Sequence, residues 1–292
     1  MLIKERKNRE LFVYISQQLE TEIIRIDSVS GGDIADAYRL TTKTKAYFLK
    51  INRGANAQKM TFAEKRGLET MEATKTISVP HVWLCDNFET NAFLLMDWVE
   101  KKSPSLDDYR FLAGKLAQLH QHTATNFGFS EDNFIGLLPQ SNHFTEQWSE
   151  FYAQQRIMPQ CRLAVKNNLL TVRDIPEKES MVDLMKRLAK DVKPSLLHGD
   201  LWGGNFVIAT DGTPYLIDPA VYYGHSLVDI AMTQLFGGFR SEFYETYYQH
   251  FPKTEFHNEL IQIYQLYYLL VHLNIFGSSY RSSVLSILNR YF

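Results

Sequence analysis

Residues 195–220 read SLLHGDLWGGNFVIATDGTPYLIDPA, and this stretch predicts a β-hairpin. The Asp211-Gly212 pair is a strong signal for a tight turn, and the apolar runs NFVIA and PYLID flank it. A two-residue turn at that pair places Asn205 directly opposite Asp218, whereas a longer loop would shift this register. Either way, an amide oxygen and a carboxylate lie at the same end of one hairpin.

Oxygen ligands in this position suit Mg²⁺, which uses one or two carboxylates and completes its coordination with water and substrate phosphates. Asp200 lies five residues before Asn205, in the loop that enters the hairpin, and can face the same point. The alternative is a hydrated loop whose Asp and Asn residues only form turns. That alternative leaves the concentration of oxygen ligands at the ends of apolar strands unexplained. The sequence therefore favours a metal site at Asn205 and Asp218.

The composition is that of a globular protein, with 292 residues, of which 45% are hydrophobic and 22% charged. A net charge of −2 gives no basic surface of the kind that binds nucleic acid. Two cysteines are too few for a disulfide framework, and the charged N-terminus MLIKERKNRE does not resemble a secretory signal. The apolar segment 259–277 contains Gln and His side chains that would be costly facing lipid. We therefore expect a buried helix there, no membrane association and a cytoplasmic protein.

Two lobes are expected from the change in pattern along the chain. Residues 23–52 contain three strand-like segments, residues 57–71 have helical periodicity, and the apolar run 93–100 suggests another strand. Helical periodicity dominates the remainder, except at the hairpin. The sequence thus predicts an α+β fold with a small β-rich N-terminal lobe, residues 1–98, and a larger, mainly helical C-terminal lobe, residues 99–292. We expect the ligand to bind between the lobes.

A buried ion pair is expected in the N-terminal lobe. Glu64 lies four residues after Met60 and four before Leu68, so its carboxylate projects from the apolar stripe of the predicted helix. Such a carboxylate is costly unless a cation meets it. Lys50 alternates with Phe48 on one face of its strand and can point inward. We expect Lys50 and Glu64 to pair; the alternative is an exposed lysine and a half-exposed glutamate that do not meet.

The motif HGDLWGGN followed by IDP resembles the catalytic and metal loops of the kinase-like small-molecule phosphotransferases, which include aminoglycoside and choline kinases. The pattern of that family is matched at Asp200, Asn205 and Asp218. More narrowly, the chain is similar to the fructosamine (ketosamine) kinase family in the segments IDPAVYYG, DIAMTQLFGGF, YQLYYLLVHLNIFGSSY, NFIGLLPQ and FYAQQRIMPQ. The likeness covers nearly the whole chain. It implies a protein-kinase-like (aminoglycoside phosphotransferase-like) fold and ATP-dependent phosphoryl transfer.

The resemblance implies a nucleotide site in the N-terminal lobe. The Lys50–Glu64 pair resembles the strand-lysine and helix-glutamate pair with which kinases hold ATP phosphates. Backbone groups at Gly31-Gly32 are implied to approach a phosphate, although two glycines more often form a plain turn. Adenine is implied to bind backbone groups around Asp97 and Val99. ATP and Mg²⁺ are therefore the expected cofactors.

In the C-terminal lobe the resemblance implies that Asp200 accepts the proton of the attacking hydroxyl. His198 is expected to brace this loop, and Asp229 to anchor it through hydrogen bonds. Trp202 is interpreted either as a core residue or as a platform beside the acceptor sugar. Tyr223, together with Tyr222, is a further candidate for that surface.

Three positions depart from the family pattern. His225, Ser226 and Leu227 stand where an acid, an arginine and another acid are expected, so we expect a weaker attraction for strongly cationic acceptors.

His120 and His122 are two residues apart on a predicted helix, face different directions and make a poor metal chelate.

The acceptor implied by the resemblance is the 3-hydroxyl of a ketosamine, either fructosamine or ribulosamine, as a small molecule or on a glycated protein amine. Such an enzyme would act in protein deglycation. One rival is an aminoglycoside or amino-alcohol (choline-like) phosphotransferase, and another is a non-catalytic, nucleotide-binding pseudokinase. A protein kinase is disfavoured because Gly199 stands where an arginine is expected and Pro219-Ala220 replaces Phe-Gly.

Overall fold

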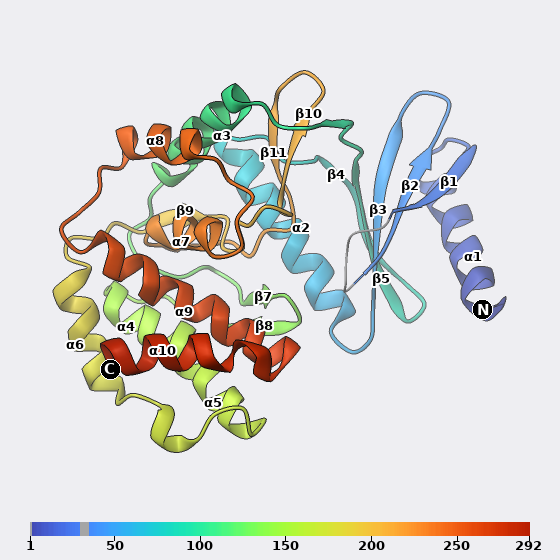
Figure 1. Ribbon diagram of the computed structural model, residues 1–292. Helices are drawn as coiled ribbons and strands as arrows, with labels where there is room; N and C mark the ends of the chain where they lie inside the picture. Colours follow the sequence, from blue (N-terminus) through green and yellow to red (C-terminus); the bar gives the residue numbers. More distant parts are fainter. Residues whose placement is uncertain (1, 30–34) are drawn as a thin grey trace. The chain divides into compact units, whose positions relative to one another are not determined.

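The structure is a computed structural model that describes residues 2–29 and 35–292 (Figure 1). The described chain divides into two compact units. The first comprises residues up to 69 together with 80–100, and the second comprises 70–79 and 101–292. The first is built around one antiparallel sheet, and the second is mainly helical, as the α+β prediction requires.

The first unit contains a five-stranded antiparallel sheet with the strand order β1-β2-β3-β5-β4. The strands are β1 (Arg25–Val29), β2 (Asp36–Thr41), β3 (Ala46–Arg53), β4 (Val82–Phe88) and β5 (Asn91–Asp97). The helices are α1 (Leu2–Gln18) and α2 (Ala57–Thr74), most of which belongs to this unit. The three strands expected within 23–52 and the helix expected at 57–71 are confirmed.

Alternation along β3 sends neighbouring side chains to opposite faces of the sheet. Leu49 and Ile51 pack in the core with Leu11 and Ile15 of α1. Lys50, which lies between them in sequence, points to the other face, where α2 lies. Helix α1 was not predicted. Within residues 8–18 its fully buried apolar side chains are those of Leu11 and Ile15, which lie one helical turn apart.

The second unit consists of helices around short strands. The strands are β6 (Lys101–Lys102), β7 (Asn133–Ile135), β8 (Leu138–Gln140), β9 (Ser195–Leu197), β10 (Phe206–Ala209), β11 (Pro214–Leu216) and β12 (Tyr222–Gly224). The helices are α3 (Leu106–His120), α4 (Trp148–Tyr152), α5 (Met158–Lys166), α6 (Lys178–Leu188), α7 (Leu227–Leu235), α8 (Ser241–His250), α9 (His257–Phe276) and α10 (Arg281–Tyr291), with a π-helical turn at Ala153–Ile157.

Helix α9 is the centre of the second unit. It is buried along most of its length and packs against α5, α7 and α10 (Figure 1). This segment was predicted to be a buried helix, and the prediction is confirmed. Over residues 2–29 and 35–292, none of the helices combines the length and the apolar character needed to cross a membrane.

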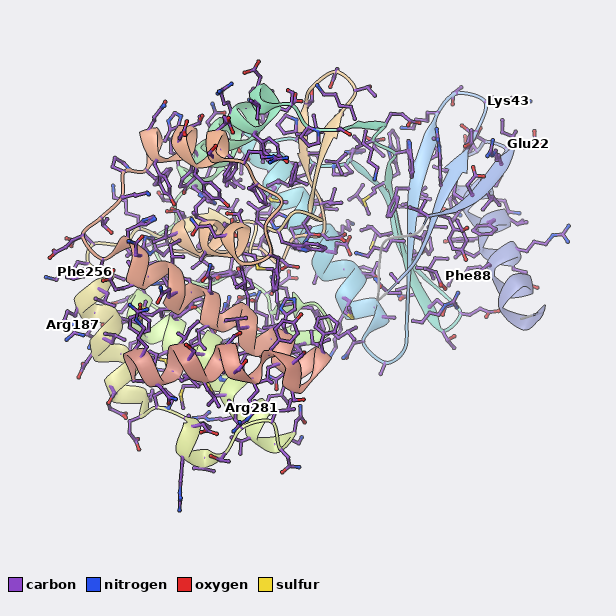
Figure 2. The ribbon with its side chains drawn as sticks, viewed as in Figure 1. Glu22, Lys43, Phe88, Arg187, Phe256 and Arg281 are labelled. Carbon is purple, nitrogen blue, oxygen red and sulfur yellow. The ribbon has the colours of Figure 1, made fainter. Side chains whose placement is uncertain are left out.

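Most charged side chains lie at the surface, as Figure 2 shows for Arg187 and Arg281. Four buried charges are exceptions, at Glu64, Asp108, Arg156 and Asp229. The Arg156 guanidinium lies 3.9 Å from the ring centroid of Tyr222, in a cation–π contact that offsets part of its desolvation. Asp108 caps α3 and lies 3.0 Å from Lys102, and Glu64 and Asp229 lie at the sites described below.

The β10–β11 hairpin forms as predicted, but its register differs by one residue. Phe206 pairs with Leu216, so the expected pairing of Asn205 with Asp218 is wrong. Asn205 lies opposite Ile217, whose N–H donates to the Asn205 carbonyl at 3.1 Å. Asp218 is the next residue, and the two candidate ligands therefore remain at the same end of the hairpin.

The shift comes from the turn. The Ala209 N–H donates to the carbonyl of Thr213 at 2.9 Å, which leaves three residues in the loop in place of two. Gly212 has a φ of +92°, in the left-handed region that a glycine adopts without strain. Three-residue loops with such a residue in the last position are a common hairpin type.

Replacing Gly212 should therefore weaken the hairpin. Gly212→Ala should lower the free energy of unfolding by about 1–2 kcal/mol, because an L-residue is strained at this φ. Gly114→Ala is the control: it lies within α3, where no described atom is within 4 Å of the added methyl group, and should raise stability by up to about 1 kcal/mol. Urea unfolding followed by circular dichroism measures both, and shifts of the same sign would contradict this view of the turn.

Candidate active site

The loop between β9 and β10 is held by one buried carboxylate. Asp229, in the first turn of α7, accepts the backbone N–H of His198 at 2.8 Å and that of Gly199 at 2.9 Å. The same carboxylate contacts Nε2 of His120 at 3.1 Å. Burial acts to raise the pKa of Asp229, but the hydrogen bond and charge of His120 outweigh it, and the pKa is lowered. The expectation that Asp229 anchors this loop is confirmed.

His198 braces the loop from within, as expected. Its Nε2 lies 2.9 Å from the Ile217 carbonyl, and its Nδ1 lies 3.2 Å from the backbone N–H of Asp200. This pattern assigns the proton to Nε2 and makes Nδ1 the acceptor. Burial lowers the pKa of His198, which favours this neutral form. The imidazole thus links the loop between β9 and β10, here called the catalytic loop after the role expected of Asp200, to the strand that leads into Asp218.

Asn205 orients Asp200. Its amide nitrogen donates to the Asp200 carbonyl at 2.8 Å and to the Asp200 carboxylate at 3.2 Å. Both amide protons are therefore used on Asp200, and the amide oxygen is the atom left to face a cation. Asp218 follows the hairpin with a φ of 54°, in the left-handed region that costs a non-glycine residue energy. Such strain is common at functional positions, where the surrounding structure maintains it.

These donors fit a hard divalent cation. The hairpin offers one carboxylate and one amide oxygen, and Mg²⁺ in phosphoryl-transfer sites takes few protein ligands and completes its shell with phosphates and water. Within the described residues, no group of three or more His, Cys, Asp or Glu side chains could hold a metal. The donor set therefore suits Mg²⁺ bound together with a nucleotide, and does not suit a closed structural metal site.

The predicted ion pair of the first unit is confirmed. Lys50 Nζ lies 2.8 Å from the Glu64 carboxylate, and the two side chains are only 17% and 10% exposed. Strand alternation and helical periodicity bring the two residues together from β3 and α2. The amine is thus fixed on one face of the sheet, where it can meet an anion.

Asp97 and Val99, which were predicted to contact adenine, lie at and just beyond the end of β5. The N–H of Asp97 donates to the His81 carbonyl at 3.0 Å, so of its two backbone groups only the carbonyl could meet an adenine. Val99 lies two residues beyond the end of β5 and is partly exposed. Gly31 and Gly32 lie outside the described residues.

The three residues predicted to form the acceptor surface differ in how far their side chains are exposed. Trp202, two residues after Asp200, is 42% exposed and is thus not a core residue. Tyr223 is half-buried, and its backbone pairs with that of Gly128. Tyr222 is fully buried beneath Arg156, so its assignment to the acceptor surface is wrong. Alternation along β12 sends these two tyrosines to opposite faces.

An aromatic cluster around His272 was not predicted. His272 lies within ring-contact distance of three aromatic side chains, at 4.5 Å from Phe236, 5.3 Å from Phe276 and 5.2 Å from Tyr280. Phe236 and Phe276 are both exposed. The turn after Phe236 packs closely against the loop between β9 and β10. The contact is so close that a methyl group added to Gly203 would lie 3.2 Å from the Cα of Gly238. His272 and Phe276 lie four residues apart on α9, and this spacing is the part of the sequence that could have predicted their contact.

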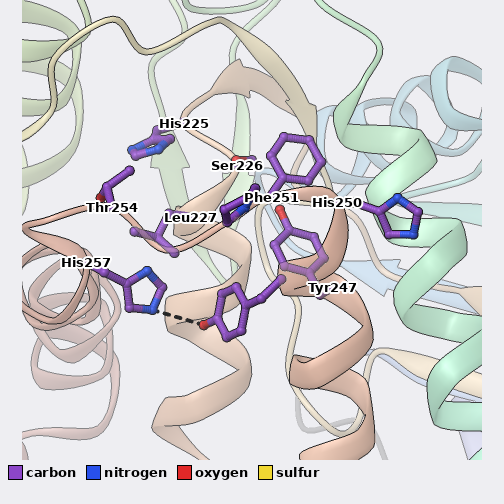
Figure 3. Close-up of a pocket in the computed structure, with 10 residues that line it drawn as sticks. His225, Ser226, Leu227, Tyr247, His250, Phe251, Thr254 and His257 are labelled. Atoms are coloured by element: carbon purple, nitrogen blue, oxygen red, sulfur yellow. Dashed lines mark hydrogen bonds between the residues drawn. The ribbon is translucent and has the colours of Figure 1, made fainter.

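Residues 225–227, which depart from the family pattern, line a pocket of about 200 Å³ (Figure 3). Strand β12 ends beside Ser195, whereas Asp200 follows the other end of β9. His225 contacts the Tyr264 hydroxyl through Nδ1 at 2.7 Å, and its two neighbours are buried. The expectation that this exchange weakens the attraction for a strongly cationic acceptor stays a prediction. The exchange alters the lining of a pocket at the far end of the β9–β12 ladder.

The Lys50–Glu64 pair should show coupling in a double-mutant cycle. Lys50→Met and Glu64→Gln should each destabilise the protein, and the double variant should recover about 1–3 kcal/mol of the summed loss, because neither charge is then left unpaired. The control cycle is Lys43 with Glu22, an exposed pair at 3.8 Å, for which coupling should stay below about 0.5 kcal/mol. Additive unfolding energies at the first pair would show that the two side chains do not interact.

Stability should fall in acid because of buried histidines. Burial lowers the pKa of His198 and of His257, and it lowers that of His225 to about 3. In each case the unfolded chain, with a histidine pKa of about 6.5, binds more protons than the native chain. The stabilisation is complete above about pH 6.5 and is lost as the pH falls, toward about pH 3 for His225. Urea unfolding from pH 7 to 5 measures the loss, and His225→Gln should reduce its slope. An unchanged slope would contradict the burial of a neutral imidazole.

Comparison with known proteins agrees with this arrangement. Residues 9–292 match the family model of fructosamine kinase. A probable ketoamine kinase of Enterococcus faecium is 42% identical over 273 residues, which cover 91% of this chain and 95% of the relative. A chloroplastic protein-ribulosamine 3-kinase of Arabidopsis thaliana is 36% identical, over 93% of this chain and 83% of the relative.

Solved structures give the same assignment. A Haemophilus somnus protein provisionally assigned as a fructosamine-3-kinase has a TM-score of 0.86 and 28% identity, covering 97% of this chain and 96% of that one. An aminoglycoside phosphotransferase has a TM-score of 0.65 at 13% identity, covering 98% of both chains, and this likeness shows the shared kinase-like fold alone. Since the family match spans nearly the whole chain, this protein belongs to the fructosamine kinase family.

Proposed function

We propose that the protein is a ketosamine kinase, which transfers the γ-phosphoryl group of ATP to the 3-hydroxyl of a fructosamine or ribulosamine. The observation that carries the proposal is the hydrogen-bonded arrangement of Asp200 and Asn205 beside the segment that leads to Asp218. Asp229 fixes the same loop by accepting two of its backbone N–H groups. The names of the relatives support the acceptor class: the Arabidopsis relative is a protein-ribulosamine 3-kinase. A small-molecule adduct and a glycated protein amine are both acceptors of this class.

Asp200 acts as the base. The acceptor oxygen forms a bond to the γ-phosphorus, the bond from that phosphorus to the bridging oxygen of ADP breaks, and the hydroxyl proton passes to the Asp200 carboxylate. Asn205 holds that carboxylate through its amide nitrogen at 3.2 Å, so the base is positioned before the acceptor arrives.

Asp218 and the amide oxygen of Asn205 would hold Mg²⁺, which would neutralise charge on the phosphate oxygens. Lys50, oriented by Glu64, is proposed to bind the ATP phosphates, and backbone groups at Asp97 and Val99 to bind adenine. The paired lysine supports this role because its amine is fixed and little exposed. We also propose a role for the Gly31-Gly32 backbone at the phosphates. The two units of the chain are proposed to be the nucleotide lobe and the acceptor lobe.

The acceptor surface is proposed to include Trp202 and Tyr223, with the His272 cluster beside them. An exposed indole two residues from the base gives a sugar a flat apolar surface, and His272 adds a polar edge. The relatives give the aminoglycoside, amino-alcohol and non-catalytic alternatives no support. Free thiols at Cys85 and Cys161 are consistent with the reducing conditions of the cytoplasm, where we propose that the protein acts.

The test is identification of the product. Incubation with ATP, Mg²⁺ and either ribuloselysine or fructoselysine should give the 3-phosphate, detected by ³¹P and ¹³C NMR, whereas kanamycin and choline should stay unmodified. Asp200→Asn should lower turnover by roughly 10²–10⁴-fold, the scale of a positioned base, while it leaves the fold and ATP binding intact.

Asp211→Asn is the matched control for that variant. Asp211 lies in the turn of the same hairpin and accepts the Thr213 N–H at 2.9 Å, so the same substitution there should leave turnover unchanged. Phosphorylation of kanamycin without any ketosamine 3-phosphate would overturn the acceptor assignment and leave the kinase assignment standing. Normal turnover in Asp200→Asn would remove Asp200 from the role of base.

A further inference from the structure

The hairpin of β7 and β8 has no role in the chemistry described above, yet it carries two buried amides. Its sequence, NFIGLLPQ over residues 133–140, ends in Asn133 and Gln140, which face each other across the strand pair. Their exposed fractions are 6% and 2%. Buried amides are costly unless every donor and acceptor is satisfied, so the partners of these two show what the hairpin holds.

The two amides form one satisfied network. Gln140 Nε2 donates to Asn133 Oδ1 at 2.7 Å and to the carbonyl of Ala220 at 3.3 Å, and Asn133 Nδ2 donates to the carbonyl of Val221 at 2.8 Å. The Tyr267 hydroxyl donates to Gln140 Oε1 at 2.6 Å. A hydroxyl donor on one side and backbone carbonyls on the other fix the orientation of both amides.

The carbonyls held in this way belong to the segment that follows Asp218. The same segment is tied to the catalytic loop from its other side, since the Ala220 N–H donates to the His198 carbonyl at 2.8 Å. Pro219 has no N–H to contribute. Asp218 itself is strained at a φ of 54°, and this conformation persists only while its surroundings hold the backbone.

We propose that Asn133 and Gln140 are positioning residues that hold the backbone after Asp218 and thereby set the direction of the metal-binding carboxylate, with Tyr267 orienting Gln140. The proposal rests on the metal role proposed for Asp218 above. The amides touch neither nucleotide nor acceptor. Their effect passes through the carbonyls of Ala220 and Val221 alone.

The experiment compares Asn133→Asp and Gln140→Glu with Asn274→Asp. Each of the first two loses the amide donors to the segment after Asp218. Asn274→Asp is the matched control, because it loses a donor to the Gln160 carbonyl at 3.0 Å, elsewhere in the same unit. Asp218→Ala serves as the reference for loss of the metal ligand.

Two measurements separate positioning from stability. Hydrogen–deuterium exchange of residues 217–224 should be at least threefold faster in Asn133→Asp and Gln140→Glu at a temperature where all variants are folded. The Mn²⁺ concentration needed for half-saturation in the presence of a non-hydrolysable ATP analogue, followed by EPR, should rise about 3–10-fold. This is less than the roughly 10–100-fold typical for a group bonded directly to a ligand, because these amides act through the backbone. The control should show neither change, even if its melting temperature falls as far.

Folded variants with wild-type exchange at 217–224 and wild-type Mn²⁺ half-saturation would overturn the proposal. Should Asn133→Asp and Gln140→Glu fail to fold, Tyr267→Phe decides, because it removes one hydroxyl and should still raise the Mn²⁺ half-saturation at least twofold. No rise in that variant would also overturn the proposal.

If the wild-type protein binds no Mn²⁺ with the nucleotide, the metal site and this proposal are both wrong. If it binds Mn²⁺ and phosphorylates no ketosamine, only the acceptor assignment falls.

Discussion

The buried carboxylate of Asp229 is the interaction on which the second unit depends. This one side chain has no exposed surface. It accepts hydrogen bonds from two consecutive backbone N–H groups of the loop between β9 and β10, and it contacts Nε2 of a histidine at the end of α3. Hydrogen bonds to a charged acceptor are stronger than neutral ones, and the low dielectric of the interior increases the difference. The loop therefore has a single path, and His198 transmits that path to the hairpin. The placement of Asp200, the proposed base, is therefore a consequence of the buried charge of Asp229.

Much of this arrangement could be predicted from local pattern. Strand alternation and helical periodicity were sufficient for Lys50 and Glu64, because each rule fixes a direction and the cost of burying one charge requires the other. The hairpin was predictable from its Asp-Gly turn, yet its register was not. Two-residue and three-residue loops share the same turn residues. A two-residue type I′ turn needs a positive φ at Asp211 as well as at Gly212, and only Gly212 has one.

Other features depend on tertiary contacts that no local pattern contains. The burial of Tyr222 is set by Arg156, which arrives from a π-helical turn more than sixty residues away in sequence. The aromatic cluster around His272 requires residues from α9, from the end of α7 and from the segment after α9 to meet. Helix α1 forms with little apolar periodicity because the sheet of the first unit supplies the surface that it covers.

The close contact between Gly199 and Ala220 limits how such an enzyme could be regulated. A Cβ atom at position 199 would lie 2.1 Å from the Ala220 carbonyl oxygen, and the backbone there has a φ of +84°. No side chain, and thus no arginine, can be introduced at this position without displacing the segment after Asp218. Regulation that relies on an arginine at this position to bind a covalently attached phosphate is therefore sterically excluded in this chain.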